Sequence, residues 1–161
     1  MSAKTNAIRL VEKANIPCEE KFYEYSEDDL SGAHAAQVLG IPEEQVFKTL
    51  VARGVKTGIN VFCIPVCCEL DLKKAAKAAG VKSVAMIHVA DINKVTGYIR
   101  GGCSPVGMKK QFVTVYDESC LAQPTIMVSG GRIGTQVECA PADLIKVTRG
   151  KTAAITQEHQ A

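Results

Sequence analysis

The 161-residue chain has no tryptophan, few other aromatic residues and almost no net charge. Aromatic residues make up 5% of the chain, so stacking of nucleic-acid bases on aromatic rings is not expected to dominate binding. A formal net charge of +2 does not by itself indicate nucleic-acid binding. No apolar run approaches about 18 residues, which argues against a membrane-spanning helix. The N-terminal stretch also lacks the apolar segment of a secretory signal, and we expect a cytoplasmic protein.

Several standard catalytic motifs are also absent. The sequence contains no GxSxG nucleophile elbow, no Walker A or GxGxxG phosphate loop and no HExxH zinc motif. The three histidines, His34, His88 and His159, are far apart in the sequence and are predicted to be surface or capping residues. Cys63, Cys67 and Cys68 have no second cysteine cluster with zinc-site spacing. We therefore expect neither a metal nor another cofactor.

Cysteine, in contrast, is frequent. An odd number of cysteines without a secretory signal predicts reduced thiols rather than a disulfide framework. The seven positions are Cys18, Cys63, Cys67, Cys68, Cys103, Cys120 and Cys139.

Length and periodicity predict a single α+β domain over residues 1–161, with a mixed, mostly antiparallel sheet and packed helices. Thr5, Ser31 and Asp71 are the predicted N-caps of three helices. The chain after Gly150 is small and polar, and residues 151–161 are predicted to be a frayed tail. Helices are predicted over residues 5–14, 31–39, 72–79, 89–95 and 141–147, strands over 19–25, 46–53, 59–66, 81–87, 112–116, 125–129 and 135–139, a hairpin turn over 54–58 and a loop over 96–107.

Lys48 is the first candidate for chemistry. Strand alternation puts it on the same, apolar face as Val46 and Leu50. Because burying a bare ammonium is costly, Lys48 must reach water, a partner or an anionic ligand. The alternative is a lysine that extends its ammonium to solvent at a sheet edge.

The segment from Gly97 to Gly107 is the second candidate. Its glycines let backbone N–H groups approach an oxyanion, a phosphate or a carboxylate, although an ordinary surface loop has the same composition. Cys103 within it is a possible nucleophile, but no histidine is fixed near it in sequence. A third candidate is a set of basic residues that would bind phosphates if they shared one face: Lys73, Lys74, Lys77, Lys109, Lys110, Arg132, Lys146, Arg149 and Lys151.

Together these segments resemble one known family. The strings VFKTL at 46–50, LDLKKAAK at 70–77, TGY at 96–98, GGCSPVG at 101–107 and VSGG at 128–131 are similar, in order and spacing, to the YbaK/EbsC proteins. These are Cys-tRNA(Pro) deacylases related to the editing domain of bacterial prolyl-tRNA synthetases. The resemblance covers roughly residues 5–150.

The resemblance implies a curled, barrel-like sheet and a site without metal or cofactor. Lys48 matches the family's key lysine, and Gly101 and Gly102 begin its glycine signature, so these three are the expected catalytic residues. One departure concerns substrate choice, because Gln136 stands where Cys-specific members often carry an acidic residue. The implied substrate-binding residues are Tyr23, Thr49, Gly97, Tyr98, Ser104, Pro105, Ser129 and Gly130.

The implied reaction is hydrolysis of the ester that joins cysteine to tRNA(Pro). The expected partners are that charged tRNA and prolyl-tRNA synthetase, which would deliver it. Backbone N–H groups of Gly101 and Gly102 would stabilise the oxyanion, and Lys48 would hold the terminal adenosine phosphate or ribose. The substrate thiol, with a pKa of about 8.5, would attack the neighbouring carbonyl in a lyase-like step and make an enzyme nucleophile unnecessary.

Three alternatives remain open at this point. The first is a deacylase for Ala-tRNA(Pro). The second is a non-catalytic tRNA-binding or synthetase-associated module, and the third is a protein that acts on a small nucleotide-linked acyl compound.

Overall fold

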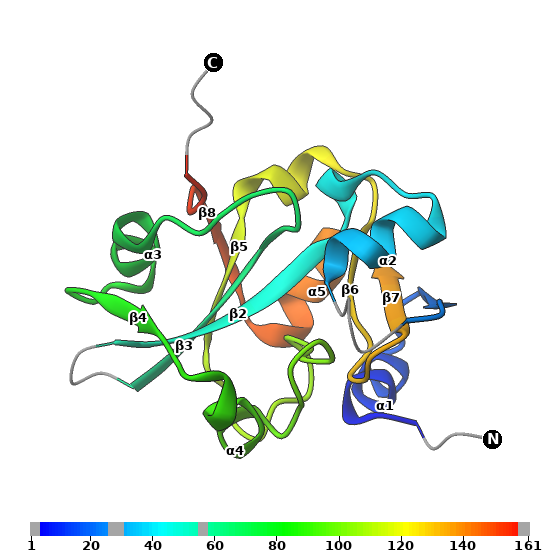
Figure 1. Ribbon diagram of the computed structural model, residues 1–161, viewed down its shortest axis with the longest axis horizontal. Coiled ribbons are helices and arrows are strands. Elements are labelled where there is room, and N and C mark those ends of the chain that lie inside the picture. Colours follow the sequence, from blue (N-terminus) through cyan, green and yellow to red (C-terminus); the bar gives the residue numbers. More distant parts are fainter. Residues whose placement is uncertain (1–3, 26–30, 55–57, 158–161) are drawn as a thin grey trace.

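The computed structural model describes residues 4–25, 31–54 and 58–157 of the chain (Figure 1). Helices and strands are interspersed along this part of the sequence, as the α+β prediction requires. No helix in these ranges is both long and apolar enough to cross a membrane. The elements are α1 Asn6–Lys13, β1 Cys18–Phe22, α2 Gly32–Leu39, η1 Glu43–Gln45, β2 Phe47–Gly54, β3 Gly58–Pro65, α3 Leu72–Ala79, β4 Val84–Met86, η2 Val89–Asp91, α4 Ile92–Thr96, β5 Val113–Asp117, η3 Glu118–Ala122, β6 Ile126–Ser129, β7 Thr135–Cys139, α5 Pro141–Thr148 and β8 Lys151–Ala153.

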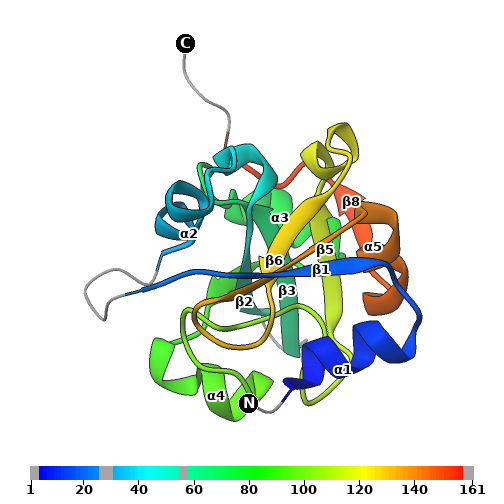
Figure 2. The same cartoon turned by 90° about the vertical axis from the view of Figure 1, so that its right-hand side faces the viewer.

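The strands form two sheets. One has the order β1-β7-β6 and is antiparallel, and the other has the order β4-β2-β3-β5-β8. In the larger sheet β5 is parallel to both β3 and β8, while the other pairings are antiparallel. Figure 2 shows β1 and β6 lying in front of β2, β3 and β5. Within the described residues, an isolated parallel bridge between Val46 and Met127 joins the two sheets.

The structure does not support the expected curled, barrel-like sheet. Beyond the Val46–Met127 bridge, β2 pairs with β3 and β4 rather than continuing along β6, so the strands do not close into a barrel. The mixed, mostly antiparallel α+β architecture is confirmed.

The predicted helix starts are confirmed by their hydrogen bonds. The side chain of Thr5 accepts from the N–H of Ile8, and that of Ser31 accepts from the N–H of His34. The Asp71 carboxylate accepts from the N–H groups of both Lys73 and Lys74 at 3.0 Å. These bonds satisfy N–H groups that a helix leaves without a partner at its start. The predicted hairpin turn over 54–58 includes residues outside the described ranges.

The two faces of β2 and β3 bury two different cores. On one face Phe47, Val61 and Cys63 pack in a cluster that includes residues of α1 and α5. On the other, Phe62 and Ile64 pack with Ala75 and Ala76 of α3. Figure 1 shows α3 and α1 at opposite sides of the molecule, and each contributes to a different one of these two cores. Because both of its faces pack against a core, β2 is held in place in the middle of the fold, and so is its edge.

The prediction of a frayed tail is wrong for residues 151–157, and the rest of that segment, 158–161, lies outside the described ranges. Residues 151–153 form β8, which pairs parallel with β5, and Ile155 is fully buried. Asp117 accepts from the N–H of Ile155 at 3.1 Å and from that of Ser119 at 3.2 Å. The segment is too short and polar to be recognised as a strand from its sequence, and these long-range contacts order it through Gln157.

Replacing Asp117 by alanine is expected to lower the free energy of unfolding by about 1–3 kcal/mol, because two N–H groups lose the buried carboxylate that satisfies them. Urea denaturation measures the change, with Glu118→Ala, an exposed neighbour, as the matched control. Equal stabilities of the two variants would show that Asp117 does not hold the C-terminal segment.

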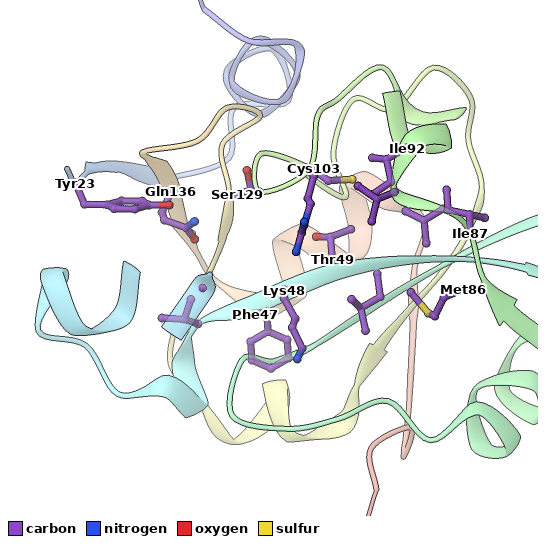
Figure 3. Close-up of a pocket in the computed structure, with 17 residues that line it drawn as sticks. Tyr23, Phe47, Lys48, Thr49, Met86, Ile87, Ile92, Cys103, Ser129 and Gln136 are labelled. Carbon is purple, nitrogen blue, oxygen red and sulfur yellow. The ribbon is translucent and has the colours of Figure 1, made fainter. Parts of the chain in front are cut away.

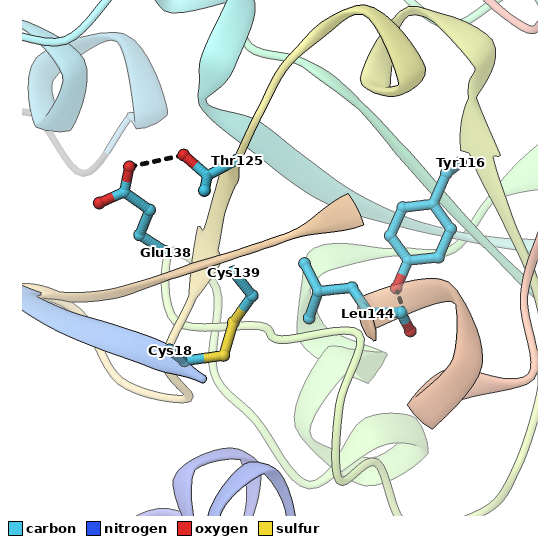
Figure 4. Close-up of a disulfide and its surroundings, with 6 residues drawn as sticks. All are labelled: Cys18, Tyr116, Thr125, Glu138, Cys139 and Leu144. Carbon is cyan, nitrogen blue, oxygen red and sulfur yellow. Dashed lines mark hydrogen bonds between the residues drawn. A yellow bond between two sulfur atoms is a disulfide. The ribbon is translucent and has the colours of Figure 1, made fainter. Parts of the chain in front are cut away.

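A disulfide joins Cys18 to Cys139, which contradicts the prediction that all seven cysteines are reduced. The register of β1 and β7 puts these two residues directly opposite each other, with Cα atoms 4.6 Å apart (Figure 4). They are separated by 121 residues in the sequence, so cysteine spacing gave no sign of the pairing. The other cysteines, Cys63, Cys67, Cys68, Cys103 and Cys120, are free thiols.

Candidate functional site

A cavity of about 370 Å³ opens along the edge of β2, where the two sheets diverge (Figure 3). Val46, the residue before β2, bridges to Met127 of β6, and β2 pairs with β4 from Ala52 onward, which leaves the edge of β2 open between these points. The carbonyl of Val46 accepts from Val66 on the β3 side, and that of Val51 accepts from Ile87 on the other side. By strand alternation, the backbone N–H and C=O of Thr49 face the open edge.

Lys48 and Thr49 leave β2 on opposite faces, as Figure 3 shows. Lys48 lies opposite Ile64 of β3, on the apolar face that the sequence predicts. Thr49 lies opposite Cys63, and its hydroxyl is 4.0 Å from the Cys63 sulfur. Both side chains line the cavity, which therefore extends around the strand edge.

The side chain of Lys48 lies near the free thiols of the turn after β3. The sulfur atoms of Cys67 and Cys68 are 3.8 Å apart. The pKa of Cys68 is raised to about 11, first by burial and then by the neighbouring Cys67 thiol and Asp117, while the positive charge of Lys48 acts in the opposite direction. Cys68 is thus a neutral thiol at physiological pH.

Three polar residues from the smaller sheet and its flank form one end of the cavity. Ser129 of β6 and Gln136 of β7 are paired across the strands, and Tyr23 follows β1 with its N–H donating to Gly134. The Ser129 hydroxyl accepts from the N–H of Gly131 at 3.1 Å. Gln136 is only 6% exposed, and its Oε1 atom has no hydrogen-bond partner in the described part of the chain. An unsatisfied buried acceptor beside a cavity is suited to a ligand that donates a hydrogen bond.

The glycine-rich loop contributes Arg100, Gly101 and Cys103 to the cavity. Gly101 has a φ of 83°, a conformation that glycine adopts without strain. The N–H of Gly102 donates to the carbonyl of Ile99 at 3.0 Å, and a Cβ at this position would lie 2.9 Å from the Cα of Arg132. Gly102 thus allows the loop to pack closely against the backbone of Arg132, and its N–H already has an acceptor.

Cys103 lines the cavity as a protonated thiol. Burial raises its pKa to about 11, while a hydrogen bond to the Thr96 hydroxyl acts in the opposite direction. Because the thiolate is the nucleophile, this environment does not activate Cys103 near neutral pH. In the described residues, no group of three or more His, Cys, Asp or Glu side chains is arranged to hold a metal ion.

The structure brings five of the eleven predicted site residues to the cavity: Tyr23, Lys48, Thr49, Gly101 and Ser129. Four others serve the loop or turn around it: Gly97 ends α4, the Tyr98 hydroxyl donates to Val106, Ser104 accepts from Val106, and Gly130 donates to Thr135. Pro105 and Gly102 are buried outside the cavity lining.

The opposite side of the cavity is an apolar wall that the sequence analysis did not predict. This wall, formed by Leu50, Met86, Ile87, Val89 and Ile92, comes from β2, β4, η2 and α4. Residues 84–92 show no motif, and only the pairing of β4 with β2 brings them to the site.

Comparisons with known proteins agree on one family. Residues 30–147 match the family described as aminoacyl-tRNA editing domain. The Enterococcus faecalis protein named "Putative Cys-tRNA(Pro)/Cys-tRNA(Cys) deacylase EbsC" is 50% identical over 153 residues, covering 95% of this chain and 93% of that protein. A proline–tRNA ligase of Brachyspira hyodysenteriae is 24% identical over 80% of this chain, which corresponds to 24% of the ligase.

Solved structures share the fold. "Crystal structure of a putative trans-editing enzyme for prolyl tRNA synthetase" aligns with a TM-score of 0.81 and 24% identity, over 98% of this chain and all of that one. "Crystal structure of hypothetical protein APE2540" aligns with a TM-score of 0.85 and 23% identity, over 94% of this chain and 99% of that one.

Proposed function

We propose that this chain, which belongs to the aminoacyl-tRNA editing domain family, hydrolyses the ester of cysteine mischarged onto tRNA(Pro). The observation that carries the proposal is the cavity, which collects Tyr23, Lys48, Thr49, Gly101 and Ser129 around an open strand edge. A small polar acyl group fits the end formed by the smaller sheet. The relative that is 50% identical over nearly its whole length supports the same substrate. Prolyl-tRNA synthetase is the proposed partner that delivers the charged tRNA.

Three groups of the chain have distinct roles in this proposal. The side chain of Lys48 extends from the face of β2 opposite to Thr49. Its ammonium holds the ribose–phosphate of the tRNA end. The N–H of Gly101 donates to the carbonyl oxygen as it becomes an oxyanion. The Oε1 of Gln136 accepts a hydrogen bond from the thiol or the α-ammonium of the substrate, which satisfies its unpaired acceptor.

The nucleophile in the proposed reaction is the substrate's own thiolate. Its sulfur, having given its proton to water, attacks the ester carbon and a C–S bond forms. The ester C–O bond breaks, and the 3′-oxygen of the tRNA leaves and takes up a proton from water. Water then opens the resulting cyclic thioester to free cysteine. A thiol with a pKa of about 8.5 supplies more thiolate at neutral pH than Cys103, whose pKa is about 11. The rate is therefore expected to rise with pH through about 8.5.

Replacing Cys103 by alanine is expected to change kcat/KM for Cys-tRNA(Pro) by no more than about threefold, because a buried neutral thiol is not the nucleophile. Single-turnover deacylation assays measure the effect. Complete loss of activity in a folded Cys103→Ala protein would instead identify Cys103 as the attacking group.

The proposed function is tested by comparing cysteinyl and seryl esters of the same tRNA(Pro). Serine has nearly the same shape but a much weaker nucleophile, so the cysteinyl ester is expected to react at least about 10²-fold faster. Equal rates would exclude substrate-thiol attack while retaining a deacylase. Binding of tRNA(Pro) without hydrolysis of either ester would indicate a non-catalytic module.

A further inference from the structure

The turn between β3 and α3 carries a pair of thiols that the proposed reaction does not use. Cys67 and Cys68 are neighbours in this turn, and their sulfur atoms are 3.8 Å apart. All seven cysteines lie in the described ranges, and Cys67 is the one free thiol that is exposed. Cys63 and Cys120 are buried, and Cys103 is partly buried in the cavity lining. A reagent that arrives from solution therefore meets the Cys67 thiol first.

Hydrogen bonds and packing hold this turn against the start of β2. The N–H of Val66 donates to the carbonyl of Val46 at 2.8 Å. The N–H of Cys68 donates to the carbonyl of Pro65 at 3.0 Å. The side chain of Val66 packs with Val46 and Met127 in a small core. The two thiols therefore have a defined position beside β2.

Lys48 of β2 lies close to these thiols. It lies opposite Ile64, three residues before Cys67, and Figure 3 shows its side chain on the side of β2 away from Thr49. Although burial dominates the pKa of Cys68 and raises it, the positive charge of Lys48 acts on this thiol in the opposite direction, so the two groups are within electrostatic reach. Lys48 forms no ion pair with any described residue. Its ammonium is therefore available to an anionic group.

The geometry of the pair excludes two other uses. In the described part of the chain, no third His, Cys, Asp or Glu side chain joins the two sulfurs to form a metal site. The Cα atoms of adjacent residues are about 3.8 Å apart across a trans peptide bond, whereas disulfides have Cα atoms at least about 4.4 Å apart. A disulfide between Cys67 and Cys68 is thus disfavoured. Exchange with an external disulfide needs neither a third ligand nor a shorter Cα separation.

We propose that Cys67 is a modification site that forms a mixed disulfide with small carboxylate-bearing thiols, and that the attached group occupies the ammonium of Lys48. A tripeptide spans about 10 Å, which lets its carboxylates extend from Cys67 to Lys48. Asp117 also acts electrostatically on this turn, but its carboxylate already accepts from the N–H groups of Ser119 and Ile155. The site of modification is independent of the proposed function, whereas its effect on activity rests on that function.

The chemical step is a thiol–disulfide exchange. The Cys67 thiol gives its proton to water, and its sulfur attacks one sulfur of the small disulfide. A new S–S bond forms, the original S–S bond breaks, and the other half leaves as a thiolate that takes up a proton from water. The Cys67 sulfur is oxidised and the departing half is reduced, so an excess of the small thiol reverses the reaction. Cys68, with a pKa of about 11, remains protonated and does not attack.

The site is tested by peptide mass mapping of the folded wild-type protein after treatment with glutathione disulfide. One glutathione is expected, attached to Cys67. Cys67→Ser is expected to prevent the adduct, and the matched variant Cys68→Ser is expected to retain it. Absence of an adduct, or an adduct at Cys68 or Cys103 instead, would overturn the inference. Because no tRNA is present, this result does not depend on the proposed hydrolysis.

The contact with Lys48 is tested by comparing glutathione disulfide with the uncharged 2-hydroxyethyl disulfide. In Lys48→Ala, the ratio of the two rates of reaction at Cys67 is expected to fall about threefold, because the carboxylates of glutathione lose the attraction of the ammonium. The rate with the uncharged disulfide reports whether the turn is still folded. An unchanged ratio would show that the attached group does not reach Lys48.

The effect on activity is tested with protein that carries one glutathione at Cys67. Its kcat/KM for Cys-tRNA(Pro) is expected to be at least about tenfold lower than that of the unmodified protein, mainly through KM, because a charge-assisted contact to the substrate is lost. Excess reduced glutathione is expected to restore it. The matched control is a methylthio group on Cys67, introduced with methyl methanethiosulfonate, which is expected to change kcat/KM by no more than about threefold.

Wild-type activity in the glutathione-modified protein, or equal effects of the two adducts, would overturn the proposed block of Lys48. Cys67→Ser treated with glutathione disulfide is expected to retain full activity. Failure of the unmodified wild type to release cysteine from Cys-tRNA(Pro), with the adduct at Cys67 and its dependence on Lys48 intact, would overturn the proposed function alone.

Discussion

Lys48→Ala is expected to lower kcat/KM for Cys-tRNA(Pro) by about 10²-fold or more. The proposed reaction requires the ester to be held at the open edge of β2, and a small misplacement of a reacting group costs a rate factor of this order. The removed ammonium lines the cavity and extends from the face of β2 opposite to Thr49. Deacylation under single-turnover conditions measures the loss.

Two further variants separate a role in binding from a role in folding. Lys48→Arg keeps the charge and is expected to recover part of the lost activity, since the guanidinium differs in shape and reach. Lys13→Ala removes an exposed lysine from α1 and is expected to leave activity unchanged. A Lys48→Ala protein with wild-type activity and unchanged thermal stability would remove Lys48 from the mechanism.

Loss of the Cys18–Cys139 disulfide is expected to lower the free energy of unfolding by about 2–5 kcal/mol. The bond closes a loop of 121 residues, and a cross-link over so long a loop strongly restricts the unfolded chain. It also holds the edge strand β1, whose neighbour in the sheet is β7. Urea denaturation of Cys18→Ala/Cys139→Ala against wild type measures the effect.

Reducing agent provides an internal control for this prediction. Dithiothreitol is expected to destabilise the wild type to the level of the double variant and to leave the double variant unchanged. Cys67→Ala, which removes an exposed free thiol, is expected to have wild-type stability. Titration of seven thiols rather than five in the unfolded, unreduced protein would show that the bond does not form in solution.

Local signals in the sequence predicted the helices and most strands well. Thr5, Ser31 and Asp71 start their helices through hydrogen bonds that span two or three residues, so the sequence contains the whole interaction. Alternation likewise placed Lys48 on the apolar face of β2, opposite Ile64. Both kinds of prediction succeed because the physical cause lies within a few residues.

Features that depend on distant pairing were not predictable in this way. The disulfide needs the register of β1 against β7, and the order of residues 151–157 needs Asp117 and β5. The apolar wall needs β4 to pair with β2. Within the glycine-rich loop, composition did not distinguish Gly101, which faces the cavity, from Gly102, whose N–H is bonded to Ile99.

Release of cysteine from Cys-tRNA(Pro) by the wild-type protein, with Ala-tRNA(Pro) assayed in parallel, tests the central claim most directly. The account predicts rapid release of cysteine and much slower release of alanine, because alanine has no thiol to attack its own ester. Release of alanine alone would contradict substrate-thiol attack and indicate a cavity that selects by size. Binding of tRNA without release of either amino acid would contradict the assignment of the cavity as a catalytic site.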